Sequence, residues 1–461
     1  MKYIAIDVGS SFIKTSLFDM KKCVIIEKRK IASPQKLENK DKNIFEISAE
    51  LLFNTVKEII DGMSEKYEDI EGVVFSTQMH GFVYDSNCEV NKEDIYVSWQ
   101  DNRCLNIIEN EGRSYIEELK ELFSKEEMAD CGVYIKPSLG LSNLYTMLYE
   151  IDNQKRTGKL YTLGSYFISR LTGNNICHIT NAAPLGFCDV VNKKWNEKII
   201  KKAGFENIVL PVIAKSDFEV CGIYKSNGQE LKIYPDYGDH QISILGSMAG
   251  KNDVVINIAT ASQVSNTTEH FMPGEYETRP FFEGRYMNTI SNMPSGRNLD
   301  VLIDFIKDTT HIITGISVDT NEIWNSVLKD FKYDLDGLTA DVGFYSTPYN
   351  MNGGKIGGIT YSNFNLNTLF SAAFYNMADV YDKNIKGLCG NNIKVEKLVF
   401  SGGVSWRIPK LLEIVSQKTG YPYCHSAIPD EAFSGLFRIA LVCAGICTDL
   451  NDKKELTLKL K

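Results

Sequence analysis

Short apolar segments that end at acidic or small residues recur along the chain, and each predicts a buried β-strand. Residues 3–6 are apolar and lead to Asp7, and a turn that contains Gly9 separates them from a second apolar segment at residues 13–18. Two strands joined by a turn of small residues are typical of a β-hairpin. A further apolar segment at residues 72–76 predicts another buried strand.

Helical spacing of apolar residues predicts helices between these strands. Apolar side chains recur every three or four positions across residues 52–63, and Ser48 lies where an N-cap is expected. A second helix is expected with Pro409 in its first turn and Gly420 at its end, and a third at the apolar residues 431–447. Because strands and helices alternate, the fold class is α/β.

The pattern of the first hairpin returns in the second half of the chain. Residues 254–261 repeat the pattern of residues 4–11. In each segment, an apolar run leads to Asp or Asn, then to a small residue, and then to Ser or Thr. Two hairpins with small polar tips can face each other across a cleft and offer backbone N–H groups to phosphates. The alternative is that both are ordinary hairpins.

Two glycine-rich segments near the C-terminus are candidates for nucleotide binding. Gly402 and Gly403 lie between a strand at residues 399–400 and a helix. There they would let a flat ligand lie close to the backbone, or would only make a tight connection. Residues 353–358 contain Lys355 among glycines but lack the Ser or Thr that follows the lysine of a P-loop. We therefore expect a mobile loop there.

Composition and charge exclude several classes of protein. The chain has 59 acidic and 50 basic residues, a formal net charge of −9, and no block rich in Lys or Arg, so a nucleic-acid partner is not expected. Its 11 dispersed cysteines lack the spacing of a zinc site and suit a reducing compartment. The N-terminus lacks a signal-peptide core, and the apolar run at residues 439–447 is too short for a membrane span. We expect a soluble cytoplasmic protein without a membrane partner.

Polar residues that could bind a polyhydroxylated ligand follow two of the expected strands. The first group is Gln78, Met79 and His80, and the second is Trp99, Gln100, Asp101 and Arg103. Tryptophan stacks on the apolar face of a sugar, while the polar side chains bond its hydroxyl groups. The alternatives are a core histidine with local partners at position 80 and a surface ion pair between Asp101 and Arg103.

Asp239 stands after Gly238 and before the apolar residues 242–245. An aspartate there could be the N-cap of a helix, or it could be a general base at the head of a cleft. Asp239 and His240 do not form a hydrolase dyad, because no G-x-S-x-G motif accompanies them.

Taken together, these segments resemble the FGGY family of carbohydrate kinases, which has the actin–hexokinase ATPase fold. The first hairpin is similar to the family's first phosphate motif, and residues 78–81 and 99–103 are similar to its two sugar-binding segments. The other four similar segments are residues 180–195 (an Asn-Ala-Ala stretch), 238–241 (the catalytic aspartate), 260–262 (the second phosphate hairpin) and 402–407 (adenosine). Seven segments in family order make the resemblance specific.

The resemblance implies two actin/hexokinase-like (ribonuclease H-like) ATPase domains flanking a central cleft. Residues 1–246 would form the N-terminal domain, which binds the sugar and carries the catalytic Asp239. Residues 247–461 would form the C-terminal domain, which binds the nucleotide. The expected partners are a small-molecule sugar and ATP, and a homodimer is compatible with the family.

The resemblance also assigns roles to individual residues. Asp239 would be the base, and Asp7 and Asp239 would act on Mg²⁺. The sugar would be bound by Gln78, Met79, His80, Trp99, Asp101, Arg103 and Asp239. ATP would be bound by Gly9, Ser10, Ser11, Lys14, Thr260, Ala261, Gly402, Gly403 and Arg407.

Within the family, residues 99–104, residues 238–241 and the Asn-Ala-Ala stretch most resemble those of sedoheptulokinases, which implies transfer of the γ-phosphoryl group of ATP to a ketose, with sedoheptulose as the expected sugar. The alternatives are a xylulokinase or another polyol or ketose kinase, and a non-enzymatic sugar-binding regulatory protein on the same fold. Three features depart from the family pattern. Its Gly-Glu-Arg loop has no counterpart, Ile408 replaces an asparagine, and residues 435–437 read Gly-Leu-Phe where the family has Gly-Ala-Ala.

Overall fold

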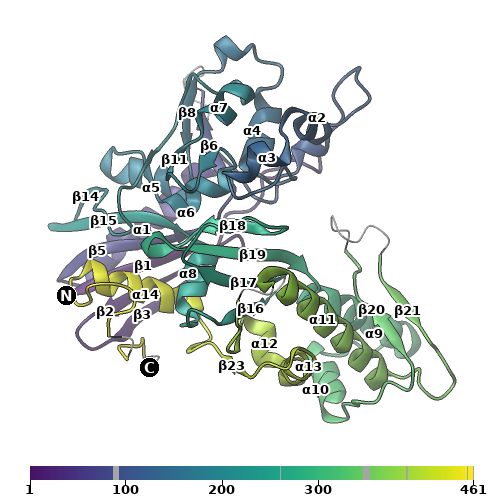
Figure 1. Cartoon of the computed structure of the whole chain (residues 1–461). Helices are drawn as coiled ribbons and strands as arrows, with labels where there is room; N and C mark the ends of the chain where they lie inside the picture. Colours follow the sequence, from purple (N-terminus) through teal and green to yellow (C-terminus); the bar gives the residue numbers. More distant parts are fainter. Residues whose placement is uncertain (87–92, 260, 346–352, 391–392, 454, 460–461) are drawn as a thin grey trace.

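Two six-stranded sheets form the framework of the chain in its computed structural model, which describes residues 1–461 apart from 87–92, 260, 346–352, 391–392, 454 and 460–461 (Figure 1). The first sheet contains, in spatial order, β14 (Gly222–Ser226), β15 (Gln229–Gly238), β5 (Ile70–Thr77), β1 (Lys2–Val8), β2 (Phe12–Asp19) and β3 (Val24–Ala32). The second contains β18 (Glu277–Pro280), β19 (Tyr286–Met293), β17 (Ser262–Thr268), β16 (Val254–Ile258), β22 (Leu398–Ser401) and β23 (Tyr423–His425). Both predicted hairpins are confirmed, because β1 pairs with β2 and β16 with β17 in antiparallel register.

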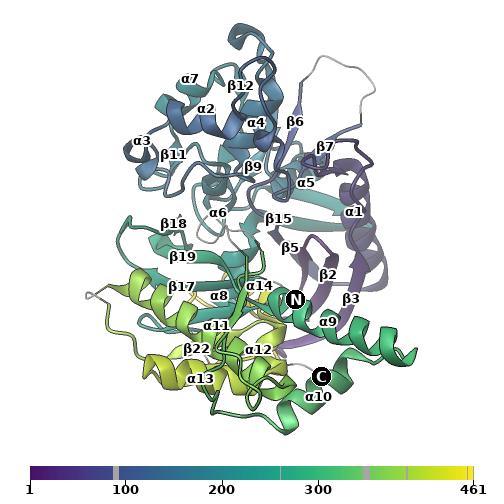
Figure 2. The ribbon, with the colours of Figure 1, turned by 90° about the vertical axis from the view of Figure 1, so that its right-hand side faces the viewer.

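Helices cover the outer face of each sheet and fill the space between the sheets (Figure 2). The first sheet is covered by α1 (Ala49–Lys66) and α5 (Leu163–Thr172), and the second by α11 (Leu366–Cys389) and α13 (Pro409–Thr419). Between the sheets lie α8 (Asp239–Gly246) and α14 (Glu431–Cys443). The molecule is therefore built around five alternating layers of helix and sheet, the α/β architecture that the alternation of elements predicts.

The two central helices touch through glycines. A Cβ atom on Gly246 would lie 1.8 Å from the carbonyl oxygen of Glu431, and one on Gly435 would lie 2.1 Å from that of Ile242. No larger residue fits at these positions without moving a helix. Leu436 and Phe437, which follow Gly435, are buried in the core between the sheets. The Gly-Leu-Phe sequence, where the family has Gly-Ala-Ala, therefore places two larger side chains in the core between the sheets.

A smaller lobe rises beside the first sheet (Figure 1). Its five-stranded sheet contains β12 (Ile208–Val209), β8 (Gly158–Tyr161), β6 (Phe82–Asp85), β7 (Ile95–Val97) and β4 (Glu46–Ser48), with α2 (Tyr115–Leu122), α3 (Lys125–Ala129), α4 (Gly140–Leu148) and α7 (Glu197–Ala203). The other α-helices are α6 (Ile179–Ala182), α9 (Gly296–Thr314), α10 (Thr320–Lys329) and α12 (Gly403–Arg407). Three short strand pairs complete the described strands: β9 (Ile176–Cys177) with β13 (Val212–Ile213), β10 (Cys188–Asp189) with β11 (Lys194–Trp195), and β20 (Thr339–Asp341) with β21 (Lys355–Gly357).

Local signals located several helix ends correctly. The Ser48 hydroxyl accepts a hydrogen bond from Leu51 N at 3.1 Å and caps α1. Gly420 ends α13 with a φ of 76°, a left-handed conformation that glycine adopts readily. The helix predicted with Pro409 in its first turn is confirmed as α13, and Ile408 before it has the extended φ of −122° that a following proline favours.

Two predictions about the C-terminal half are wrong. The glycine-rich segment 353–358 includes a strand, β21, which pairs with β20 in a register that joins Ala340 to Ile356. The last helix ends at Cys443 because the chain turns at Gly445, whose φ is 68°, so Cys447 is buried beyond the helix. The ten described cysteines are free thiols, and no described helix is both long and apolar enough to cross a bilayer.

Candidate active site

The ends of three parallel strands bring the predicted sugar and phosphate segments to one edge of the first sheet. Val8 at the end of β1 is paired with Thr77 at the end of β5, and Thr77 is paired in turn with Gly238 at the end of β15. Asp7, Gln78 and Asp239 therefore come together, although more than 150 residues separate Gln78 from Asp239 (239 − 78 = 161). In α/β sheets, ligands bind at such carboxyl-terminal edges.

Two carboxylates at this edge influence each other. Burial, and then the negative charge of Asp7, raise the pKa of Asp239 to about 7. Burial also raises the pKa of Asp7, and Lys14, whose Nζ lies 3.6 Å from Asp7 Oδ2, lowers it. The N-cap interpretation of Asp239 is wrong, because Gly238 is the N-cap of α8 and Asp239 is its first residue. A carboxylate with a pKa near neutrality is suited to accept a proton.

The same pair is the candidate metal site. No cluster of three or more His, Cys, Asp or Glu side chains that could hold a metal occurs in the described part of the chain. Two buried carboxylates that repel each other would nevertheless attract a cation. Mg²⁺ binds through one or two carboxylates and keeps most of its water ligands, so Asp7 and Asp239 suit this ion.

Buried polar atoms without partners lie beside Asp239. Gln78 is 3% exposed, and neither atom of its amide group has a hydrogen-bond partner among the described residues. The Tyr96 hydroxyl is also buried without a described partner, and the charge of Asp239 contributes to its raised pKa after burial itself. Met79 packs against Gly238. Because buried polar groups are almost always hydrogen-bonded, these atoms indicate that a ligand or water binds here.

The third member of the first sugar segment, His80, has local partners as the alternative interpretation expected. Its Nδ1 lies 3.0 Å from the carbonyl oxygen of Pro184, and its Nε2 lies 3.3 Å from an Arg279 nitrogen. Because the guanidinium only donates, Nε2 accepts and Nδ1–H donates to Pro184. Burial, with the charges of Lys136 and Arg279, lowers the pKa of His80 well below its usual value. His80 is therefore a neutral histidine held in a fixed tautomer.

Arg279 is a site residue that the sequence did not reveal. It is 5% exposed and extends from β18 of the second sheet to His80 and to His240, whose Nδ1 lies 3.3 Å from an Arg279 nitrogen. Glu277 accepts hydrogen bonds from Arg279 and forms an ion pair with Lys136 of the smaller lobe. Burial and the charge of Arg279 lower the pKa of His240 to about 3. This polar cluster connects the smaller lobe, α8 and the second sheet beside the edge that carries Asp239.

Two residues of the second predicted sugar segment, Asp101 and Arg103, belong to a buried hydrogen-bond network. Asp101 is completely buried, and its carboxylate accepts hydrogen bonds from Phe45 N at 2.7 Å and from the guanidinium of Arg103. Arg103 is 7% exposed and also pairs with Glu46 at 2.7 Å. The surface-ion-pair interpretation is therefore wrong, because the pair is buried. Trp99, in contrast, is 42% exposed, so its ring is accessible to a ligand.

A hydrogen-bond network under the edge fixes the position of Asp239. Asn181 Nδ2 donates to Thr77 Oγ1 at 3.0 Å and to Asp236 O at 2.9 Å, and so joins β5 to β15. The Thr180 hydroxyl accepts from Gly238 N at 2.9 Å. The segment that contains the Asn-Ala-Ala stretch therefore holds Gly238, the residue before Asp239, by hydrogen bonds.

The two phosphate hairpins differ in how far they can be described. In the first, Gly9 N donates to Phe12 O at 3.1 Å and closes a tip formed with Ser10 and Ser11. Lys14 lies between two carboxylates, at 3.6 Å from Asp7 and 3.6 Å from Asp430. In the second hairpin Thr260 lies outside the described residues, while Ala261 directly precedes β17.

The predicted adenosine residues adjoin the second hairpin. Gly402, with a φ of 84°, packs so closely on β16 that a Cβ atom would lie 2.5 Å from Ile258 O. A small cavity of about 130 Å³ lies beside it, and Ala259, Val404 and Arg407 line it. Gly403 begins α12, the helix that carries the last two of these residues.

The first turn of α9 completes the wall of this cavity and was missed by the sequence analysis. Gly296 N donates to Ala259 O at 3.2 Å, and the side chains of Arg297 and Asp300 line the cavity. Arg297 stacks on Tyr345 at 4.6 Å. The signal in the sequence was the pair Ser295-Gly296 before an apolar helical pattern, and Ser295 indeed caps α9.

Comparison with known proteins identifies the family of the chain. The N-terminal domain of the FGGY family of carbohydrate kinases matches residues 2–234, half of the chain, and the chain belongs to this family. A sedoheptulokinase of Homo sapiens is 21% identical over 289 residues, which cover 56% of this chain and 57% of that protein. A xylulose kinase of Staphylococcus xylosus is 22% identical over 286 residues, which cover 58% and 56%. The chain thus spans little more than half the length of these relatives.

Solved structures extend the likeness of fold to the whole chain. A ligand-bound xylulose kinase from Lactobacillus acidophilus superimposes with a TM-score of 0.81 at 17% identity, over 99% of this chain and 92% of that one. A Plasmodium falciparum glycerol kinase with ADP gives a TM-score of 0.82 at 16% identity, over 100% and 95%. The expected fold of two actin-like ATPase domains is therefore confirmed.

Proposed function

We propose that this protein is an ATP-dependent sugar kinase that transfers the γ-phosphoryl group of ATP to a hydroxyl group of a ketose. The observation that carries the proposal is the buried Asp239, with a pKa of about 7, beside Asp7 and the unpartnered amide of Gln78. Asp239 accepts the proton of the sugar hydroxyl, the oxygen forms a bond to the γ-phosphorus, and the bond from that phosphorus to the bridging oxygen breaks to release ADP.

The other predicted residues divide between the two substrates. His80, Trp99 and Gln78 line the sugar side, and the tips of the two hairpins hold the phosphates with backbone N–H groups. When bound near Asp7 and Asp239, Mg²⁺ would neutralise phosphate charge. We place the boundary between the domains after α8, near residue 247. Closure of the domains would exclude water and limit ATP hydrolysis.

The sugar we propose is sedoheptulose, on the resemblance of residues 78–81 and 99–103 and the likeness to a sedoheptulokinase. In an ADP-release assay with ketoses, polyols and aldonates, we expect the highest kcat/KM with sedoheptulose and a lower value with xylulose. Sedoheptulose has two CHOH groups more than xylulose, so the size of the difference depends on whether the site hydrogen-bonds their hydroxyl groups. A highest kcat/KM with glycerol or an aldose would contradict this substrate, and no ADP release with any sugar would favour the sugar-binding regulatory protein.

Mg²⁺ and ATP together should stabilise the fold. A ligand present at about 100 times its Kd adds roughly 2.7 kcal/mol to the free energy of unfolding, which a thermal melt detects as a higher Tm. Lys14→Met is the matched variant, because it removes a cation from the first phosphate hairpin, and it should reduce the shift. An unchanged Tm of the wild-type protein at millimolar Mg-ATP would contradict nucleotide binding.

A further inference from the structure

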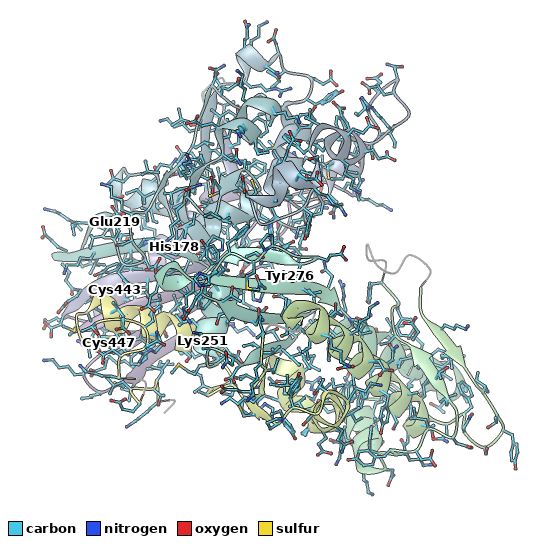
Figure 3. The ribbon with its side chains drawn as sticks, viewed as in Figure 1. His178, Glu219, Lys251, Tyr276, Cys443 and Cys447 are labelled. Atoms are coloured by element: carbon cyan, nitrogen blue, oxygen red, sulfur yellow. The ribbon has the colours of Figure 1, made fainter. Side chains whose placement is uncertain are left out.

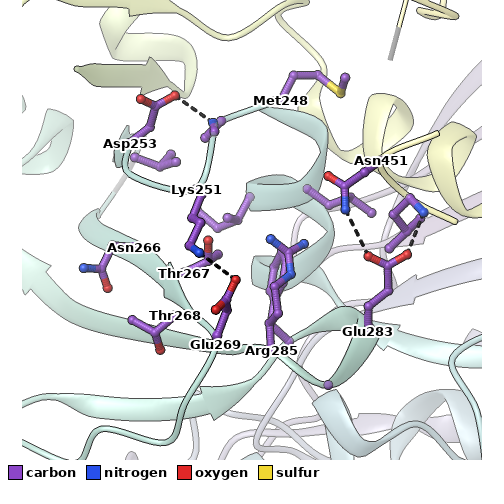
Figure 4. Close-up of a pocket in the computed structure, with 18 residues that line it drawn as sticks. Met248, Lys251, Asp253, Asn266, Thr267, Thr268, Glu269, Glu283, Arg285 and Asn451 are labelled. Carbon is purple, nitrogen blue, oxygen red and sulfur yellow. Dashed lines mark hydrogen bonds and ion pairs between the residues drawn. The ribbon is translucent and has the colours of Figure 1, made fainter. Parts of the chain in front are cut away.

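A pocket separate from the strand edge at Asp239 lies at the far end of α8 (Figure 4). Its volume is about 450 Å³, within the range of roughly 300–1,000 Å³ found for small-molecule sites. The end of α8, the turn between β18 and β19, the end of β17 and the C-terminal segment around Leu450 form its walls. None of the sugar or nucleotide residues described above lines it, so it is a separate site.

The carboxylates of this pocket all have partners. Glu283 accepts hydrogen bonds from Leu450 N at 2.6 Å and from Asn451 Nδ2 at 3.3 Å. Asp253 accepts one from Gly250 N at 2.7 Å, and Glu269 pairs with Lys251 at 2.7 Å. Their negative charges are thus already compensated within the pocket walls.

Arg285 is a charged residue of this pocket that forms no ion pair with a described residue. Its guanidinium points into the middle of the pocket between these two groups of contacts (Figure 4). Its buried Nε has no hydrogen-bond partner among the described residues. The guanidinium lies 5.2 Å from the centre of the Phe281 ring, which holds it in place. Arginine stays charged at every physiological pH, and the Glu269 carboxylate interacts with this charge without forming an ion pair, so an anion or water can still bind the guanidinium.

We propose that this pocket is a regulatory site for a small organic anion, a carboxylate or a phosphate monoester. The anionic group binds the planar guanidinium of Arg285, whose paired N–H groups match the geometry of both kinds of anion. The apolar side chains of Ile244 and Leu245 on α8, together with Phe281, pack against the organic part.

A chain of hydrogen bonds connects the pocket to Gly238, the N-cap of α8. Glu283 N donates to Asp217 Oδ2 at 2.6 Å, and Asp217 Oδ1 lies 3.0 Å from His178 Nε2. Figure 3 labels His178. On its other side, His178 Nδ1 lies 2.7 Å from the Thr180 hydroxyl, which accepts from Gly238 N.

The direction of these bonds follows from the backbone. Thr180 N donates to His178 Nδ1 at 3.3 Å, so Nδ1 is the acceptor and Nε2–H donates to Asp217. Every bond from Glu283 to Gly238 therefore has a defined donor. A ligand that shifts the 283–285 turn acts on the residue before Asp239 through this chain, and on Asp239 directly through α8.

Binding can be tested without any assay of activity. Met248 lines the pocket, so the methyl group of [methyl-¹³C]Met248, assigned with Met248→Leu, reports on it by NMR. We expect titration with inorganic phosphate or with succinate to move this signal in a saturable way, and the more effective probe tells a phosphate from a carboxylate ligand. Arg285→Ala should weaken binding at least tenfold, and Arg285→Lys, which keeps the charge but not the paired N–H groups, should give an intermediate value. A signal that neither probe moves, or equal titration of wild type and Arg285→Ala at unchanged Tm, would overturn the site.

The regulatory part rests on the proposed kinase function. We expect the effective probe to change kcat at least twofold in the wild-type protein and to leave it unchanged in Arg285→Ala. Asp217→Asn should still bind the probe, by the Met248 signal, but transmit less of the effect. Binding without a change in kcat would overturn the regulation. If the chain is not a kinase, the Met248 titration still tests the pocket, so the two failures are distinguishable.

Discussion

Asp239→Asn is expected to lower kcat by about 10²–10⁴ while the protein keeps its fold and its affinity for sugar. Asparagine has nearly the same shape as aspartate but cannot accept the proton of the sugar hydroxyl. The carboxylate is suited to this role because burial and the charge of Asp7 raise its pKa to about 7. The measurements are kcat and KM from ADP release, with Tm as the test of folding.

The matched control is Asp319→Asn, at the start of α10. Asp319 caps that helix by accepting a hydrogen bond from Asn321 N at 2.8 Å, and asparagine caps nearly as well, so kcat and Tm should both stay at wild-type values. The wild-type pH profile gives a second test, since kcat/KM should fall as the pH drops through about 7 and Asp239 is protonated. A wild-type kcat in folded Asp239→Asn would remove Asp239 from the mechanism.

The parts of the fold that the sequence predicts are those encoded locally. The strands β1 and β16 are apolar runs, and each is followed within a few residues by the strand with which it forms a hairpin. The start of α1 depends on Ser48, three residues from the amide that it caps. Asp239 could be singled out because a glycine, an acidic residue and an apolar helix follow one another directly.

Features that depend on distant contacts could not be predicted. β18 is a polar sequence, Glu-Thr-Arg-Pro, which has no strand pattern of its own and is defined by pairing Thr278 with Asn288 of β19. The burial of Asp101 and Arg103 depends on Phe45 and Glu46, more than fifty residues earlier in the chain (101 − 45 = 56 and 103 − 46 = 57). The same limitation applies to α9, whose Arg297 and Asp300 reach the cavity beside α12 only after the second sheet has formed.

The cluster around Arg279 gives the second large expected effect, on stability. Arg279→Met should lower the free energy of unfolding by about 3 kcal/mol, near the lower end of the range for breaking a buried ion pair. The loss leaves the Glu277 carboxylate buried with Lys136 as its remaining charged partner. The midpoint of urea unfolding measures the change, and methionine keeps most of the apolar volume of the arginine side chain.

The pH dependence and a double variant separate lost charge pairing from lost packing. Although burial raises it, the charges of Arg279 and then Lys136 lower the pKa of Glu277 below its usual range. A lowered pKa contributes stability above the unfolded value of about 4.3 that is lost as the pH falls. The deficit of Arg279→Met should therefore shrink as the pH is lowered through this value. Adding Glu277→Gln to Arg279→Met removes the buried charge and should recover much of the lost stability at neutral pH. A deficit that is the same at every pH, and that Glu277→Gln deepens, would mean that Arg279 stabilises the cleft by packing alone.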